Sequence, residues 1–412
     1  MRITHIETIR AERQPSLMFV QVHTDAGITG LGETCVGVSA VEAYLHETAA
    51  PGLIGSDPRD IARAWTAARS QFIGFGGSSV AVRATSAVDI ALWDILGKAA
   101  GLPLFRLLGG PVRDSIRIYN TCAGPGYGSS SSNVNRKRWG LVDEEPEGPY
   151  EDLLASVTRP EELVGSLRDS GVTAMKIWPF DEAALRSGGL WIDRSDLREG
   201  VKIIERTRAA AGDDMDILLE MHSLWSPQAA LTIARAVEDF DLFWIEDPFR
   251  VDSPEALTRF ADKTRIPLTV GETIGTRFDY HRLLRSGTVS YLMFDVGWVG
   301  GISEAVRVAS LAETYGVPVA PHDCTGPVVL TAGVHLCAHL PNAVMQETVR
   351  AFYHGWYRDF VTDLPKLEAG RISPPEGPGL GLELRPEVRH RTDLHVRTTG
   401  PAAAASSTGR SS

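Results

Sequence analysis

Residues 242–248 of the chain read Leu-Phe-Trp-Ile-Glu-Asp-Pro, a short apolar run that ends in Glu246. The apolar run before it ends in Leu218-Leu219-Glu220, and the run after it leads through Val270-Gly271 to Glu272. From one glutamate to the next is 26 residues in both cases, which is about the length of one strand and one helix. This repeat predicts parallel strands that alternate with helices, each strand ending in a carboxylate.

The same alternation continues on both sides of these three runs. Amphipathic segments of helix length separate the apolar runs, the clearest being residues 198–210, 227–239, 254–262 and 302–315. Eight strands with intervening helices favour a closed parallel barrel over an open doubly wound sheet, so we expect an α/β barrel over residues 116–350. Its strands are predicted at residues 116–120, 174–178, 217–221, 242–245, 268–271, 291–296, 317–321 and 343–347.

The first 115 residues follow a different pattern. Three alternating apolar runs predict a small antiparallel sheet, and a helical stripe comes after them. That helix is expected over residues 86–100, with Ser86 as its N-cap and Gly101 at its end. A sheet followed by helices predicts an α+β domain over residues 1–115. The strands of its sheet are expected at residues 3–9, 17–23 and 31–36.

Three segments depart from both patterns. Residues 124–149 are rich in Gly, Ser, Asn and charge, so we expect a long loop after the first barrel strand. A loop of this size at a barrel mouth is expected to act as a lid, with a passive insertion as the alternative. Residues 351–397 contain several prolines and glycines and are expected to return to the N-terminal domain. Residues 398–412 are expected to be disordered.

Composition excludes several classes of protein. Of the 412 residues, 43% are hydrophobic and 23% charged, which argues against disorder, fibres and coiled coils. The net charge of -11 is spread along the chain and the only concentrated basic stretch, residues 136–138, is short, so nucleic acid is not an expected partner. Four scattered cysteines and the lack of a membrane-spanning apolar run predict a cytoplasmic protein with reduced thiols.

Glu220, Glu246 and Glu272 are expected to converge, because the carboxyl ends of neighbouring barrel strands meet at the barrel mouth. Three crowded carboxylates repel and raise one another's pKa unless a cation lies among them. Oxygen ligands without cysteine favour Mg²⁺, with Mn²⁺ as a substitute. The sequence therefore predicts one metal ion per subunit. The alternative is that each glutamate merely caps the helix that follows it.

A second group of polar residues comes at the ends of the last three strands. Asp295 ends the sixth strand and His322 the seventh, 27 residues later. Asp295 is expected to orient and charge His322, whose alternative role is structural. Glu347 ends the eighth strand and is expected to contact a developing enolate oxygen or a substrate carboxylate in either protonation state. Alternatively, Glu347 is an ordinary acidic residue at the surface.

Together these residues resemble the enolase superfamily, and within it the mandelate racemase-like acid-sugar dehydratases of the galactonate and mannonate dehydratase type. The resemblance covers nearly the whole chain and depends on the order and spacing of several short motifs. It implies a modified TIM barrel, (β/α)7β, with an N-terminal α+β capping domain, one Mg²⁺ ion and an enolate intermediate. The motifs are Asp89-Ile90-Ala91-Leu92-Trp93-Asp94 with Gly97-Lys98, Leu107-Leu108-Gly109-Gly110, Trp244-Ile245-Glu246-Asp247-Pro248, Gly271-Glu272 and Phe294-Asp295.

The resemblance also implies roles for individual residues. His222, in Glu220-Met221-His222, matches the histidine that serves galactonate and mannonate dehydratases as the general acid for the leaving hydroxyl. On a strand, His222 would point the same way as Glu220. The other matches are the metal ligands Glu220, Glu246 and Glu272, the dyad His322 and Asp295, and the last-strand glutamate Glu347.

The second strand departs from the pattern of the subgroup. It reads Lys176-Ile177-Trp178, where racemases and many lactonizing enzymes carry two lysines. Trp178 cannot accept a proton, which disfavours a two-base racemase and leaves His322 as the expected base. Lys176 is expected to place positive charge beside the substrate carboxylate. The residues expected to contact substrate are Lys176, Trp178, His222 and Glu347.

The predicted activity is that of a lyase that dehydrates a sugar acid to a 2-keto-3-deoxy acid after Mg²⁺-dependent removal of the proton alpha to the carboxylate. One alternative is an epimerase, racemase or cycloisomerase that uses the same enolate, with His222 and His322 as bases on opposite faces. Another is an inactive metal-binding barrel. The resemblance also implies a homo-oligomer, from dimer to octamer. The choice of sugar acid depends on the shape of residues 10–18, 36–42 and 124–149, which the sequence does not reveal.

Overall fold

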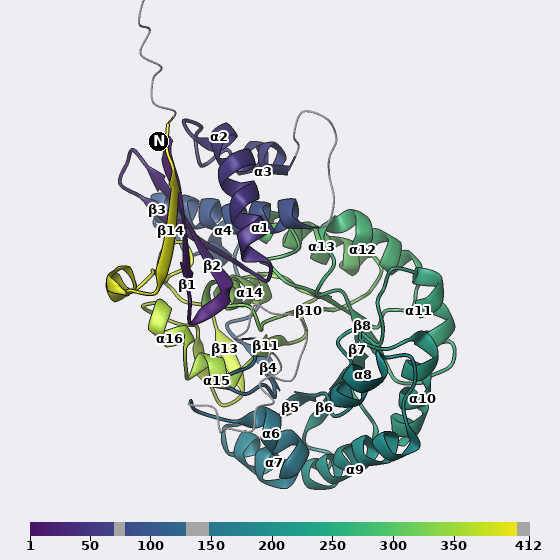
Figure 1. Ribbon diagram of the computed structural model, residues 1–412. Helices are drawn as coiled ribbons and strands as arrows, with labels where there is room; N and C mark the ends of the chain where they lie inside the picture. The colour runs from purple at the N-terminus through teal and green to yellow at the C-terminus, as the bar shows by residue number, and fades with distance from the viewer. Residues whose placement is uncertain (70–78, 129–147, 402–412) are drawn as a thin grey trace, which may run out of the picture.

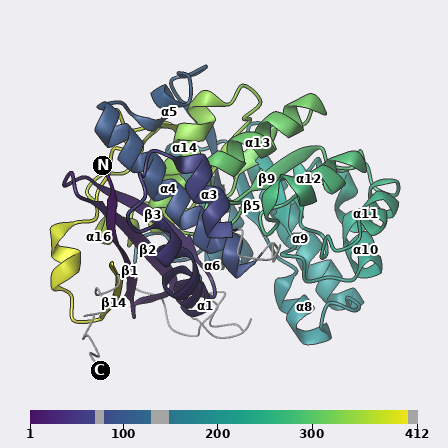
Figure 2. The same ribbon diagram turned by 90° about the horizontal axis from the view of Figure 1, so that it is seen from above.

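The computed structural model describes residues 1–69, 79–128 and 148–401. Its larger part is a ring of strands surrounded by helices, and a smaller part, the cap, lies against one side of the ring (Figure 1). Seen from above, the cap and the barrel lie next to each other (Figure 2). Helix α4 (Val80–Ala100) of the cap is in contact with α13 (Gly301–Thr314) of the barrel.

Eight parallel strands form the barrel. Strands β4 to β10 pair in chain order, and β11 pairs with β4. A parallel bridge between Val319 and Ala343 joins β10 to the residues just before β11, so the ring closes. The predicted modified TIM barrel is confirmed. Its strands are β4 (Ile116–Thr121), β5 (Ala174–Ile177), β6 (Asp216–Glu220), β7 (Trp244–Glu246), β8 (Leu268–Val270), β9 (Tyr291–Phe294), β10 (Val319–Pro321) and β11 (Gln346–Thr348).

The barrel strands are short continuous apolar runs because both of their faces are buried. Leu218 and Trp244 belong to the cluster that fills the barrel interior, whereas their neighbours Leu219 and Ile245 pack into the larger cluster shared with the helices. The helices of the barrel are α6 (Asp152–Thr158), α7 (Pro160–Asp169), α8 (Asp181–Ser187), α9 (Arg194–Ala211), α10 (Pro227–Val237), α11 (Pro254–Ala261), α12 (Thr276–Arg285), α13 and α14 (Pro327–His339).

A four-stranded antiparallel sheet with strand order β14-β1-β2-β3 forms one layer of the cap. Strand β14 comes from the C-terminal end of the chain, and its Thr398 pairs with Glu7 of β1. The expectation of disorder from residue 398 is therefore wrong for Thr398 and Thr399, whose backbones complete the sheet edge; residues 402–412 lie outside the described residues. The cap elements are β1 (Ile3–Ala11), β2 (Gln14–Thr24), β3 (Thr29–Cys35), β14 (Leu394–Thr399), α1 (Val38–Tyr44), a π-helix (Leu45–Ala49), α2 (Ala50–Leu53), α3 (Ile61–Arg69), α4 and α5 (Leu104–Leu107).

The chain contacts both parts of the molecule after the last barrel strand. Strand β13 pairs with the start of β4, and β14 then pairs with β1 of the cap. The elements of this segment are α15 (Arg350–Tyr353), α16 (Tyr357–Phe360), β12 (Lys366–Glu368), β13 (Arg371–Ser373) and a 3-10 helix (Pro386–His390).

Helix α4 begins six residues before its expected start. Ser86, predicted as the N-cap, lies inside the helix, where its Oγ donates to Val82 O at 2.8 Å and accepts from Gly300 N at 2.9 Å. The N-cap expectation was wrong because small and aliphatic residues extend the helix back to Val80. Gly101 ends the helix in the left-handed conformation (φ 67°), as predicted. None of the described helices is long and apolar enough to cross a membrane.

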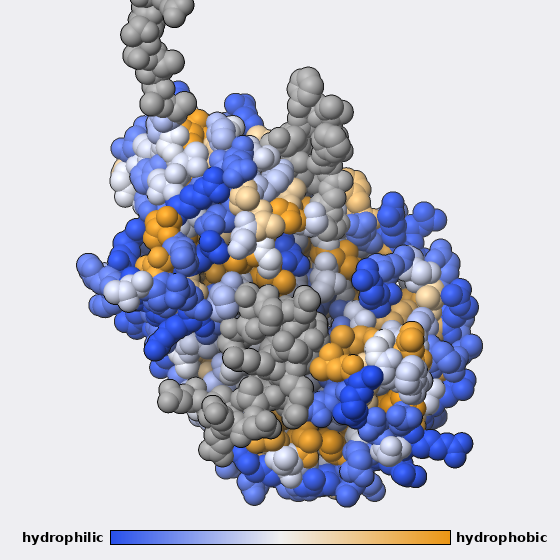
Figure 3. Space-filling view, in the orientation of Figure 1, coloured by the Kyte–Doolittle hydropathy of each residue, from blue (hydrophilic) through white to orange (hydrophobic). Residues whose placement is uncertain are grey.

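Strand β3 connects the cap to the barrel loops that follow β9 and β10. Glu33 accepts from Val328 N and Val329 N at the start of α14, and Thr34 Oγ1 donates to Gly297 O at 2.9 Å. On the face shown in Figure 3, apolar side chains gather where the cap meets the barrel, while the outer helices are largely hydrophilic. The cap is therefore attached at the edge of the barrel mouth by both polar and apolar contacts.

Gly32→Ala should destabilise the protein, because β3 lies directly against α4 and a Cβ at residue 32 would lie 1.8 Å from Ala87 O. We expect the free energy of unfolding, measured by urea titration, to fall by about 3 kcal/mol. The matched control is Gly165→Ala in α7, where a Cβ meets no atom within 4 Å; it should raise that free energy by roughly 1 kcal/mol. Wild-type stability of Gly32→Ala would contradict the close packing.

Candidate active site

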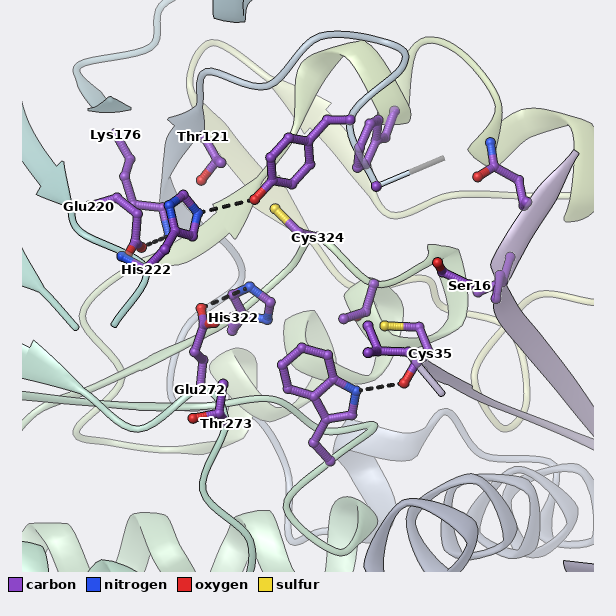
Figure 4. Close-up of a pocket in the computed structure, with 18 of the residues that line it drawn as sticks. Ser16, Cys35, Thr121, Lys176, Glu220, His222, Glu272, Thr273, His322 and Cys324 are labelled. Atoms are coloured by element: carbon purple, nitrogen blue, oxygen red, sulfur yellow. Dashed lines mark hydrogen bonds and ion pairs between the residues drawn. The ribbon is translucent and has the colours of Figure 1, made fainter. Parts of the chain in front are cut away.

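A cavity of about 290 Å³ lies between the cap and the barrel mouth. The barrel contributes charged residues from the ends of its strands, and the cap contributes residues of β2, β3 and α4 (Figure 4). Trp356, from the segment after β11, also lines it. The charged and titratable lining residues include Arg83, Lys176, Glu220, His222, Glu272 and His322.

The three glutamates proposed as metal ligands lie together. One carboxylate oxygen from each of Glu220, Glu246 and Glu272 lies within 4.8 Å of the other two. Glu220 Oε1 accepts from the backbone N–H groups of Met221 and His222, whereas the buried Glu220 Oε2 accepts no hydrogen bond from the described residues and has the Lys176 ammonium nearby, at 3.2 Å. A buried carboxylate oxygen that accepts no hydrogen bond, in an all-oxygen cluster, fits a hard divalent cation such as Mg²⁺.

Lys176 lies among the same carboxylates. Its Nζ is 2.5 Å from Glu246 Oε1, 2.8 Å from Glu347 Oε1 and 3.2 Å from Glu220 Oε2. Burial alone would lower the pKa of Lys176, but the surrounding carboxylates outweigh it and raise that pKa well above its usual value. Lys176 is therefore a permanent cation within the cluster.

His322 and Asp295 form the predicted pair at the ends of β10 and β9. His322 Nδ1 lies 2.8 Å from Asp295 Oδ2, and the other ring nitrogen, Nε2, lies 3.2 Å from Glu272 Oε2. Burial opposes a charged imidazole, yet Glu272, Glu347 and Asp295 together raise the pKa of His322 well above its usual value. The Trp298 ring lies 5.5 Å from the His322 ring and forms the adjacent wall of the cavity.

Glu347 is fully buried and does not line the cavity. Its carboxylate accepts from Thr121 Oγ1, from Lys176 and from Asp323 N. Burial favours the neutral acid, but Lys176 and His322 outweigh it and lower the pKa of Glu347, so the residue is ionised. Glu347 therefore orders Lys176 and the residues after β10, and the expected contact with substrate stays a prediction.

His222 lies beside Glu220 for a reason other than strand geometry. β6 ends at Glu220, and His222 follows in the left-handed conformation (φ 48°), so the alternation of strand side chains does not apply. Its Nδ1 lies 2.6 Å from Asp181 Oδ2, and its Nε2 lies 3.1 Å from the Tyr127 hydroxyl. Burial lowers the pKa of His222, but Asp181 and Glu220 outweigh burial and raise it to about 9.

Trp178 stands at the position where racemases and many lactonizing enzymes carry a second lysine. It is buried and does not line the cavity, but its ring contacts two residues that do. The Trp178 ring centroid is 5.3 Å from that of His222, in a T-shaped arrangement, and 5.6 Å from that of Tyr127. Trp178 therefore supports the position of His222, and direct contact with substrate stays a prediction.

Several residues of the site were not among those predicted from the sequence. Asp181 begins α8 shortly after β5, so the rule that located the glutamates at strand ends would have found it. Tyr127 lies in the segment predicted as a lid, most of which (residues 129–147) is outside the described residues. Arg83 and Trp298 had no local signal, because they reach the cavity only when the cap packs on the barrel.

Comparison with known proteins identifies this arrangement. Residues 160–388 match the enolase C-terminal domain-like family, and residues 4–109 match the N-terminal domain of mandelate racemase and muconate lactonizing enzymes. A D-galactonate dehydratase from Ralstonia nicotianae is 31% identical over 395 residues, which cover 93% of this chain and 92% of that protein. A D-galactonate dehydratase from Ralstonia pickettii is 32% identical with the same coverage.

Solved structures agree with the sequence relatives. A mandelate racemase-subgroup enolase from Agrobacterium tumefaciens superimposes with a TM-score of 0.85 at 43% identity, over 97% of this chain and 99% of that chain. An enolase protein from the Sargasso Sea environmental genome gives a TM-score of 0.85 at 40% identity, over 98% and 100% of the two chains. The chain therefore belongs to the enolase superfamily, in the mandelate racemase/muconate lactonizing enzyme family.

Proposed function

We propose that the protein is a hydro-lyase that dehydrates a sugar acid to a 2-keto-3-deoxy acid with the help of one Mg²⁺ ion. The observation that carries this proposal is the presence of two His–Asp pairs in one cavity with a three-glutamate cluster. Dehydration needs a base for the alpha proton and an acid for the departing hydroxyl, and the two pairs provide one candidate for each. The names of the D-galactonate dehydratase relatives support the same reaction.

Glu220, Glu246 and Glu272 would hold the metal ion. When bound, Mg²⁺ would supply positive charge beside the substrate carboxylate, where negative charge accumulates as the alpha proton leaves. Lys176 adds a fixed positive charge at the same place, because it is held there by Glu246 and Glu347.

His322 is the proposed base. Asp295 binds Nδ1, which leaves Nε2 on the side of the cavity where Glu272 lies. Asp295 fixes the orientation of the ring and stabilises the imidazolium that forms when Nε2 accepts the proton. Neutralising Glu272 with a bound cation would lower the pKa of His322 toward the range in which an imidazole serves as a base.

His222 is the proposed acid. With a pKa raised to about 9, it is protonated at neutral pH and can donate a proton to the hydroxyl on the beta carbon as that group leaves. Asp181 receives Nδ1–H, so Nε2 is the nitrogen from which the proton would be transferred. The Tyr127 hydroxyl lies 3.1 Å from that nitrogen.

Epimerisation or cycloisomerisation on the same site is the second candidate, because both histidines line the cavity. It would require His222 to act as a base, and the carboxylates around His222 favour its protonated form instead. An inactive metal-binding barrel would have no use for two oriented His–Asp pairs. The cytoplasmic location and the homo-oligomer stay predictions from the sequence.

Metal binding can be tested through thermal stability, which does not depend on enzyme activity. Mg²⁺ at about 100 times its Kd should raise the melting temperature of the wild-type protein, because a ligand that binds only the folded state stabilises it by RT ln(1 + [L]/Kd), which is about 2.7 kcal/mol at that concentration. Glu220→Gln should abolish most of this increase. The control is Glu313→Gln, an exposed residue of α13, which should respond like the wild type. An unchanged Mg²⁺ response in Glu220→Gln would remove that residue from the metal site.

His322→Asn should lower kcat for dehydration by about 100-fold to 10,000-fold, because the proton at the alpha carbon would lose its acceptor. Activity is followed as 2-keto acid formation from a panel of sugar acids. Mg²⁺ should raise the melting temperature of the same variant as it does for the wild type. This result would show that the variant has lost its base and not its metal ion. Turnover close to that of the wild type would show that His322 is not the base.

His222→Asn should separate the two halves of the reaction. In deuterated water we expect it to exchange the alpha proton of the recovered substrate while forming keto acid at least about 100 times more slowly than the wild type. Asp181→Asn should reduce dehydration less, because His222 stays in place and only its orientation and charge are affected. If wild-type protein exchanged the alpha proton and formed no keto acid, the epimerase would replace the dehydratase.

A further inference from the structure

Arg83, in the first turn of α4, is the one charged residue among the described residues of the cap that lines the cavity. Its Nη1 donates to Val36 O at 2.7 Å and lies 3.4 Å from Cys35 O, and its guanidinium lies 4.9 Å from the centre of the Trp298 ring. The backbone at the end of β3 and an aromatic ring therefore hold the side chain against the cavity wall.

The surroundings of Arg83 differ from those of the other cavity cation. Lys176 contacts three carboxylates, whereas no carboxylate among the described residues lies within ion-pair distance of Arg83. Only Nη1 has acceptors, so the Nε and Nη2 donors have none within the described parts of the chain. A half-buried guanidinium with free donors on one edge has the geometry to bind a carboxylate through two parallel hydrogen bonds.

The place of Arg83 relative to the proposed catalytic groups limits what it can bind. Figure 4 shows Cys35 and Ser16 at the end of the cavity opposite Lys176 and His222, with His322 between the two ends. Arg83 contacts Cys35, so it belongs to the end away from Lys176. A substrate whose reacting carboxylate lies near Lys176 would extend past His322 toward Arg83.

We propose that Arg83 binds a second carboxylate at the far end of the substrate, and that the substrate class is the dicarboxylic sugar acids rather than the monocarboxylic ones. This inference rests on the proposed function, which places the first carboxylate at the Lys176 end. Ser16, whose backbone carbonyl accepts from Val36 N, lines the cavity at the Arg83 end, and Gln14 of the same strand also lines it. They offer a hydroxyl and an amide to the hydroxyl groups of the substrate.

The test compares pairs of acids that have the same stereochemistry and differ only in the oxidation of the terminal carbon: galactonate with galactarate, gluconate with glucarate, and mannonate with mannarate. For the pair that contains the acid with the highest kcat/KM, the wild-type kcat/KM should be at least about 10-fold higher for the dicarboxylate than for the monocarboxylate. Arg83→Met should lower the ratio of kcat/KM for the dicarboxylate to kcat/KM for the monocarboxylate by about 10-fold to 100-fold. The change should come mainly from a higher KM for the dicarboxylate, as expected for loss of a charge-assisted pair. Arg83→Lys, which keeps the charge without the fork, should give an intermediate ratio.

Arg63→Met is the matched control, since Arg63 is a cap arginine with 82% of its side chain exposed, and its ratio should equal that of the wild type. A wild-type ratio of one or less, or an unchanged ratio in Arg83→Met with normal melting temperature, would overturn the assignment. If no acid is turned over, the proposed function fails. The inference about Arg83 is then tested separately by measuring the binding of the same acids by calorimetry. The inference is supported if the wild-type protein binds a dicarboxylate more tightly than the matching monocarboxylate and Arg83→Met weakens that binding. It is overturned if the two acids bind equally well, or if no dicarboxylate binds.

Discussion

Repulsion among buried carboxylates is the constraint on which the site depends. Glu220, Glu246 and Glu347 surround the single ammonium group of Lys176, and Glu272 completes the cluster beside His322. Lys176 and a protonated His322 do not balance four ionised glutamates, and burial together with Glu220 raises the pKa of Glu246 well above its usual value. A buried uncompensated charge costs several kcal/mol even after the protein relaxes, at roughly the level known for broken buried ion pairs. A divalent cation relieves that cost, so the cluster favours metal binding for the same reason that it is unfavourable alone.

The strand-end positions could be predicted from the sequence because they depend on a short-range rule. A parallel barrel brings the carboxyl ends of its strands to one face, so the order and spacing of the strands predict that Glu220, Glu246 and Glu272 lie together. His222 was associated with Glu220 for the wrong reason. The chain leaves β6 at Glu220, and a left-handed turn rather than strand alternation brings the imidazole to the cavity.

Contacts that depend on the cap could not be predicted in this way. Thr34 meets Gly297, 263 residues later in the chain, and no local pattern marks either residue as a partner of the other. The same holds for Arg83 and Trp298, which meet only because α4 and β3 pack against the loop after β9. Hydrophobic periodicity predicts which face of an element is buried, but it does not predict which distant element covers that face.

The two His–Asp pairs have the same composition, and their surroundings determine how they differ. His222 is paired with Asp181 and lies next to Glu220, so its pKa of about 9 favours the acid form. His322 faces Glu272, which belongs to the metal cluster, so its pKa depends on whether that carboxylate keeps its charge. A cation bound by the three glutamates would therefore act most directly on the pKa of His322, whereas Asp181, which is not part of the cluster, would continue to hold His222 in its protonated form. Two histidines in one cavity can thus serve as base and acid at the same pH. The metal cluster includes Glu272, which is a direct ion-pair partner of His322, whereas its member beside His222, Glu220, raises the pKa of that residue less than Asp181 does.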